Sequence, residues 1–549
     1  ASGTNAIAIG SNTTATSNNS FVLGAAAKAD GDGAGAIGYF ANTSGKDAMA
    51  VGVRACALAE SSMAVGTKAL AKGTDSIAIG YQASAVETNA SAIGTKANAS
   101  GVNSMAFGAH ARAHGSNSTA IGAKSFANKT NSFVIGPNTT ACGVNAGAIG
   151  ASANANGESS LAIGVQSFAK EKSSLALGTN AKSIGKNSTA IAVNASATGA
   201  NSMAIGYFSS SNGVNSAALS VMANATGNNS VALGVFANAQ GGNALSFGTF
   251  SLASGTNATA ISSNSSATGD NSIAIGVDSV ANKQNAQSFG VSATAAGINA
   301  VAIAAGSFAN GRNSMAMGVL ANATALNTAA IGTYARATQN GALAFGANSS
   351  AIANYTMAFG VNALASSNNA IAIGRYANAT GNVSIALGMF ASAISNDTFA
   401  AGAFAQALNK NALAIGTNAT ATGENTMAIG TRSLAREKDS FAAGLEAKAQ
   451  GFNTMALGHS SLALRKNSLA YGTNASALAN NAMATGTNAF ASGDSSIASG
   501  TSAKALRDGA LAFGPSALAS ANETIAMGAR AEATGDYGIA IGYEALANQ

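Results

Sequence analysis

The sequence predicts an all-β fold, a parallel β-roll (solenoid) of about 39 fourteen-residue coils, and three observations support this prediction. An Ala-apolar-Gly step returns at every fourteenth position, and Gly10 and Gly542 are separated by 38 such steps without insertion or deletion. Large apolar residues recur at a spacing of two, which is the period of a β-strand. Polar segments with Gly and Asn, typical of tight turns, separate the strands. Because any inserted module would shift the period, residues 1–549 are expected to form one continuous domain.

The first predicted strand precedes the repeat glycine, which we number as position 0. Positions −3 and −1 carry large apolar residues, such as Ile273 and Ile275, and position −2 between them is almost always alanine. A strand that is apolar on both faces is covered on both faces. We expect the −3 and −1 side chains to fill the interior of the coil and the −2 alanines to face a neighbouring copy. The expected oligomer-facing residues include Ala106, Ala204 and Ala274.

The second predicted strand follows the glycine. Positions +3 and +5 are mainly alanine, as at Ala69 and Ala71, whereas positions +2 and +4 vary freely. This pattern indicates one buried and one solvent-facing side. Gly-x-Asn-Ser segments such as residues 101–104 supply the positive φ that a tight turn requires. With coils about 4.8 Å apart, the array would form a rod roughly 190 Å long.

A row of alanine methyl groups along the array is apolar and smooth. Surfaces of this kind on soluble proteins are typical of association, and small side chains permit a close approach of two backbones. We therefore expect a homo-oligomer packed along its whole length, with cyclic symmetry that aligns each coil with its own copies.

Composition excludes several classes of protein. The chain is 47% hydrophobic and 9% charged, so it is not disordered. Its 27 Lys and Arg residues are spread over 549 positions, which predicts no dense basic patch and no nucleic-acid partner. Cys56 and Cys142 lie six coils apart, too far for a disulfide within a straight solenoid. A membrane-spanning helix needs about 18 or more consecutive apolar residues, and because no run here reaches that length, membrane insertion by this segment is not expected.

The motif itself resembles a known family. Residues 103–108 (NSMAFG), 201–206 (NSMAIG) and 271–276 (NSIAIG) are similar to the NSVAIG-type repeat of YadA-like heads in trimeric autotransporter adhesins. The resemblance implies a left-handed roll, a homotrimer about a threefold axis, an extracellular place on the bacterial surface, and binding to host matrix such as collagen or to host cells. The family normally continues into a neck, a coiled-coil stalk and a membrane anchor. This chain ends at Gln549 within the repeat, so either those parts are missing from it or it is a free-standing fibre.

The sequence offers little for catalysis. His110 and His114 fall in one coil, His459 is distant, and no carboxylate pair shares their register, so no catalytic residue, metal or cofactor is expected. The chain is therefore interpreted as a non-enzyme.

Aromatic residues at position +2 are the most suggestive surface feature. In a parallel stack, residues separated by one full repeat lie one above another, so two ladders are predicted. Their rings stabilise the stack, or they form an apolar patch for a host ligand or a neighbouring fibre. The ladder residues are Phe236 with Phe250, and Tyr376 with Phe390 and Phe404.

Two functions compete on this evidence. The first is a surface adhesin head that binds host matrix or cell surfaces through its outer strands. The alternative is a structural filament, spacer or sheath fibre without a specific ligand, whose partners are lateral copies. An ice-binding solenoid is disfavoured, because positions +2 and +4 do not repeat one hydroxyl residue.

Overall fold

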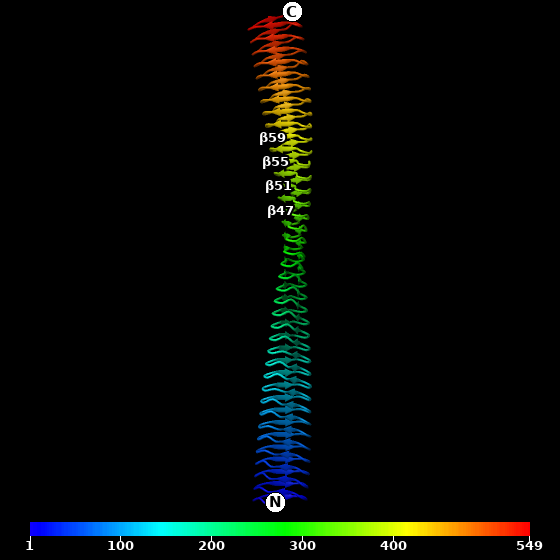
Figure 1. Cartoon of the computed structure of the whole chain (residues 1–549), viewed down its shortest axis with the longest axis vertical. Helices are drawn as coiled ribbons and strands as arrows, with labels where there is room; N and C mark the ends of the chain where they lie inside the picture. The colour runs from blue at the N-terminus through cyan, green and yellow to red at the C-terminus, as the bar shows by residue number, and fades with distance from the viewer. Residues whose placement is uncertain (549) are drawn as a thin grey trace. The chain divides into compact units, whose positions relative to one another are not determined.

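The computed structural model describes residues 1–548, which contain strands and turns (Figure 1). Strands of three and two residues alternate along the chain, from β1 (Ile7–Ile9) and β2 (Thr14–Ala15) to β77 (Ile539–Ile541) and β78 (Leu546–Ala547). The chain divides into two compact units, Ala1–Val277 and Asp278–Gln549, and the same coil repeats in each. Within residues 1–548 no helix has the length and apolarity of a membrane span. The predicted all-β parallel solenoid of about 39 turns is confirmed.

Within each unit, strands pair in parallel with the strand one repeat further along the chain. In β15 (Met105–Phe107) and β17 (Thr119–Ile121), Met105 lies beside Thr119 and Phe107 beside Ile121. The two-residue strands form the second sheet in the same register, as in β16 (Arg112–Ala113) and β18 (Phe126–Ala127). Every side chain therefore stands directly above the equivalent residue of the preceding repeat. Any sequence feature that recurs in successive repeats becomes a continuous row on the surface.

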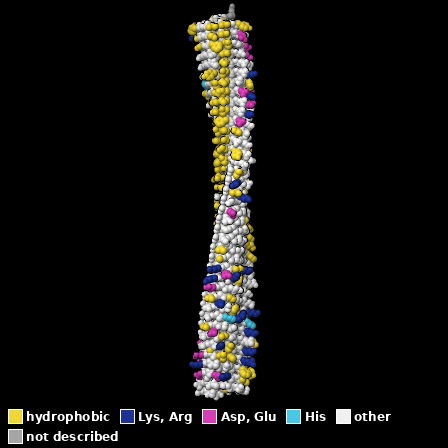
Figure 2. Space-filling model, viewed as in Figure 1, with side chains coloured by type: hydrophobic (Ala, Val, Ile, Leu, Met, Phe, Trp, Pro, Cys, Tyr) yellow, Lys and Arg dark blue, Asp and Glu magenta, His cyan; other side chains and the backbone are white. Residues whose placement is uncertain are grey.

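The predicted orientation of the first strand is wrong. Ala106, Ala204 and Ala274 are all 0% exposed and point into the coil of their own chain, whereas Phe107 is 51% exposed and Met105 is 45% exposed. Large apolar side chains of this kind lie on the surface of each unit (Figure 2). The physical reason is volume, because the two sheets of a coil lie so close together that the interior admits only small groups. Val22 and Val134 are the largest side chains that are fully buried.

The interior is filled by positions −4, −2, +3 and +5, which carry mostly Ala, Ser and Thr. Position +5 is buried and position +2 faces solvent, as predicted for the second strand. Many buried hydroxyls donate to a carbonyl three residues earlier, as from Ser209 to Gly206 at 2.9 Å. Serine replaces alanine at position −2 at Ser246, whose Oγ lies 2.6 Å from that of Ser251, and at Ser288, which donates to the carbonyl of Ala293 at 2.7 Å. The core is thus narrow, and some of its hydroxyls, among them those of Ser118, Ser202 and Ser314, are buried without a hydrogen-bond partner.

Three positions in each coil have positive φ, namely the repeat glycine, position +2 and position −5. Gly360 has a φ of +136°, and a Cβ there would lie 2.4 Å from the carbonyl oxygen of Gly374 in the next coil. Asparagine often occupies position −5, and its amide joins successive coils, as from Asn103 Nδ2 to Asn117 Oδ1 at 3.0 Å. These side-chain ladders supplement the backbone hydrogen bonds between coils.

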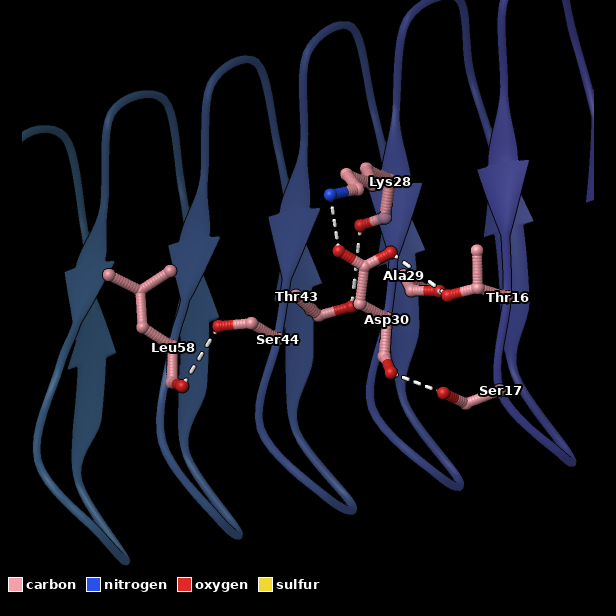
Figure 3. A network of polar contacts seen from close by, with 8 residues as sticks. All are labelled: Thr16, Ser17, Lys28, Ala29, Asp30, Thr43, Ser44 and Leu58. Carbon is pink, nitrogen blue, oxygen red and sulfur yellow. Dashed lines mark hydrogen bonds and ion pairs between the residues drawn. The ribbon is translucent and has the colours of Figure 1, made fainter.

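The corner opposite the repeat glycine is also joined by side chains (Figure 3). Thr16 donates to a carboxylate oxygen of Asp30 at 3.0 Å, and Lys28 forms an ion pair with the same carboxylate. Ser44 donates to the carbonyl of Leu58 at 2.9 Å. Consecutive coils are therefore held at their corners as well as along their strands.

Candidate association and adhesion surfaces

The outward side chains at positions −3 and −1 form what we call the apolar strip. Exposed members include Phe107 at 51%, Ile135 at 43%, Ile373 at 43% and Tyr471 at 58%. In Figure 2 a continuous yellow band crosses the side where Figure 1 labels β47 (Ala329–Ile331), β51 (Met357–Phe359), β55 (Ile385–Leu387) and β59 (Leu413–Ile415). An isolated soluble protein rarely exposes so long an apolar surface. The strip is therefore the candidate association surface of the chain.

This assignment replaces the one made from sequence. Ala106, Ala204 and Ala274 cannot contact a neighbouring copy, because their own coil encloses them completely. The strip also contains a ring stack that sequence reasoning missed, in which Phe345 and Phe359 lie 4.6 Å apart with an angle of 4° between their planes. Both rings are at position −1, which was expected to lie inside the coil.

The aromatic ladder consists of Tyr376, Phe390 and Phe404. The ring centroids of Tyr376 and Phe390 are 4.8 Å apart, and those of Phe390 and Phe404 are 5.0 Å apart, with nearly parallel planes. All three side chains are about 40% exposed. The guanidinium carbon of Arg375 lies 5.2 Å from the centroid of the Tyr376 ring. The repeat spacing correctly predicts this stack.

A second aromatic pair lies in the first unit. Phe236 and Phe250 stack with centroids 4.9 Å apart and an interplanar angle of 6°, and they are 43% and 58% exposed. This pair and the aromatic ladder both occupy position +2 of the repeat. Their rings are therefore exposed at the same turn of their coils.

A basic groove lies on the outward side of the first unit. It is lined by Lys96, Asn98, His110, Arg112 and Lys124. Figure 2 shows dark blue side chains gathered near cyan histidine side chains in the lower part of the view. Composition did not predict this groove, because residues one repeat apart in sequence are adjacent in the stack. The expectation of no dense basic patch is wrong for this stretch.

The remaining titratable groups show no converging chemistry. Burial, with a smaller contribution from the charge of Arg112, lowers the pKa of His114, which packs edge-on against Phe126. Cys56 and Cys142 are free thiols, and burial raises the pKa of both. Within residues 1–548 no three His, Cys, Asp or Glu side chains gather as a metal site would require.

These features define a class of protein, a β-solenoid whose narrow interior holds small side chains and whose large apolar side chains lie on the outside. The sequence model described as YadA head domain repeat (2 copies) matches the chain from residues 1–27 to residues 519–545, and the longest unmatched stretch is 287–308. The chain belongs to this family. A comparison with curated proteins found no match.

Family membership confirms the resemblance drawn from the NSMAIG-type motifs. It identifies the chain as a surface protein of the trimeric autotransporter adhesin type, a family that forms homotrimers on the bacterial exterior. Together with the solenoid fold, it indicates a structural rather than an enzymatic protein.

Proposed function

We propose that three copies of this chain pack with their apolar strips toward a common axis and form an adhesin head that binds host matrix or host cell surfaces through its outer strands and turns. The observation that carries this proposal is the division of side chains by size. Small groups fill each coil, and every large apolar row lies outside. Three strips that face one another enclose the core that a single chain lacks.

The energetics favour such an assembly. Full burial of a Val, Leu, Ile or Phe side chain contributes about 1.5–3 kcal/mol. Covering the exposed half of a residue such as Phe107 therefore contributes about 1 kcal/mol, and the strip offers two positions in every coil. Dozens of coils exceed the association cost of about 4–15 kcal/mol many times over.

The aromatic ladder is the proposed adhesive patch. Tyr376, Phe390 and Phe404 have φ values of 56–59°, a left-handed conformation that suits Asn or Gly and strains bulky residues. Asn348 and Asn362 occupy the same row immediately before the ladder and need no such strain. Rings kept at a strained, solvent-exposed position support a role in binding, because aromatic anchors dominate the energy of many interfaces.

The test compares two triple variants of the full chain for binding to immobilised collagen and to decellularised tissue matrix. Tyr376→Ser, Phe390→Ser and Phe404→Ser together should weaken binding by about tenfold or more. The control changes Asn348, Asn362 and Asn418 to Ser in the same row and should bind as the parent does. Equal binding by both variants, with circular dichroism showing both folded, would leave the rings a role in stacking alone.

A structural filament or spacer is the second candidate. Phe236 and Phe250 repeat the ladder motif in the first unit, and aromatic patches in both units suit side-by-side packing of assemblies. In that case the aromatic triple variant would reduce lateral bundling, measured by light scattering, without changing binding to collagen or matrix.

A further inference from the structure

The basic groove lies in a stretch without acidic residues. Between Glu87 and Glu158 the sequence contains neither Asp nor Glu, although it contains four Lys or Arg residues and two His. The chain has two longer acid-free stretches, 172–269 and 279–396, but these spread three and four Lys or Arg residues over 98 and 118 positions, whereas the four cations here fall within residues 96–129. The cationic residues are Lys96, Arg112, Lys124 and Lys129.

Stacking concentrates these charges. Lys96, His110 and Lys124 occupy position +2 of three consecutive coils, whose turns are joined by backbone hydrogen bonds of 2.7–2.8 Å. Asn98 and Arg112 occupy position +4 beside them, and the groove runs between the two rows. The cations therefore recur along the groove at a spacing of about 4.8 Å per coil. Among residues 1–548, the ion pairs include none formed by Lys96, Arg112 or Lys124.

Self-association leaves this charge unneutralised. Cyclic symmetry places each coil beside the same coil of its neighbours. The neighbouring copies therefore contribute residues 88–157 at this height, and that stretch has no carboxylate side chain on any face of the coil. An assembled trimer would carry three such grooves, each with a positive field directed outward.

The residues around the groove favour one class of anionic ligand over another. Sites for single-stranded nucleic acid combine basic grooves with open aromatic faces on which bases stack. The Phe126 ring beside this groove is half-buried and already in contact with two side chains, since the guanidinium carbon of Arg112 lies 4.7 Å from its centroid and the centroid of the His114 ring lies 5.1 Å from it. The groove instead offers one Lys or Arg donor in each of three consecutive coils, Lys96, Arg112 and Lys124. Such donors suit the tetrahedral anionic groups of an extended polymer.

We propose that this groove binds a linear sulfated polysaccharide, with Lys96, Arg112 and Lys124 contacting its sulfate groups. The inference rests on the proposed role of the chain in binding host matrix, and it names one chemical class within that matrix. It places this contact in the first unit, on residues separate from the aromatic ladder of the second unit.

The experiment measures binding of the full chain to heparin, to chemically desulfated heparin and to double-stranded DNA at several salt concentrations. The parent protein should bind heparin, with affinity that falls as salt rises, and should bind desulfated heparin poorly. Changing Lys96, Arg112 and Lys124 to Gln should weaken heparin binding by about tenfold or more and flatten its salt dependence. The charge-matched control changes Arg336, Lys448 and Lys504 to Gln, three cations at position +4 that do not line the groove, and should retain heparin binding.

Three results would overturn the inference: heparin binding unaffected by the groove variant, equal loss in the control, or tighter binding of DNA than of heparin through the same residues. Circular dichroism and sedimentation confirm that each variant is folded and assembled. The Tyr376, Phe390 and Phe404 variant should bind heparin normally. Failure of the parent to bind collagen and matrix would count against the adhesin proposal, whereas failure of the groove variant to change heparin binding counts against this inference alone.

Discussion

The apolar strip makes a quantitative prediction about stability. Replacing Ile93, Phe107, Ile121 and Ile135 with Ser removes four consecutive position −1 side chains. Their positions in the sheet are fixed by parallel pairing, and each keeps part of its surface exposed in the single chain. Packing within the chain and covering by partners should each contribute about 1 kcal/mol per side chain. The variant should therefore lose about 8 kcal/mol of local stability per chain, half of it from the partners.

A matched control isolates the partners' share. Leu70, Phe168, Leu252 and Leu364 occupy position +4 of the outward sheet and are similarly half-buried. Replacing them with Ser removes the same kind of surface from the opposite face, so the control should lose only about 1 kcal/mol at each altered coil, against about 2 kcal/mol per coil in the strip variant.

Hydrogen exchange provides the assay, because it reports stability coil by coil. The difference of about 1 kcal/mol per altered coil corresponds to an about fivefold larger loss of amide protection, coil for coil, within residues 91–135 of the strip variant than in the altered coils of the control. Sedimentation should show that both variants remain assembled, since dozens of unaltered coils persist. If both variants lost equal protection, the strip would not be covered and the reasoning would fail.

Three further predictions follow from the coil itself. Ala204→Leu should overpack the interior and cost about 1–3 kcal/mol or more of local stability, seen as faster hydrogen exchange near residue 204; unchanged exchange would mean that the core is not size-limited. Gly360→Ala should open the turn to proteolysis at residues 358–362, because its Cβ would meet the Gly374 carbonyl at 2.4 Å, and resistance equal to the parent would refute the close approach. Burial and Arg112 lower the pKa of His114, so its unfolded state takes up the proton first, and local stability should fall as pH drops below the usual histidine value of about 6.5. His114→Gln should flatten that pH dependence in exchange measurements, and an identical slope in the variant would remove His114 as its source.

The sequence predicted much of the fold because its period is strict. A constant fourteen-residue spacing fixes which side chains stack, so the pairing of Tyr376 with Phe390 and of Phe236 with Phe250 could be predicted without coordinates. The turns at glycine and asparagine could also be predicted, because these residue types favour the positive φ found at Gly360 and Asn103.

The orientation of the first strand could not be read from polarity. Both faces of segments such as Met105-Ala106-Phe107 are apolar, so hydrophobicity does not say which face is inside. The decisive signal was size, since near-invariant alanine at position −2 marks an interior with fixed, small volume. The basic groove was missed for a different reason. The density of basic residues was judged from their spacing in sequence. Lys96, His110 and Lys124 are fourteen residues apart in sequence but adjacent in the stacked coils.

The central claim is that assembly covers the apolar strip, and cysteine accessibility tests it directly. In a full chain with Cys56→Ser and Cys142→Ser, single Phe107→Cys and Phe250→Cys variants probe the strip and the aromatic row, whose side chains are 51% and 58% exposed in the isolated chain. Under reducing conditions, maleimide should label the Phe250→Cys variant rapidly in the native protein and the Phe107→Cys variant only after denaturation. Rapid labelling of the native Phe107→Cys variant would show that the strip faces solvent and would contradict the assembly described above.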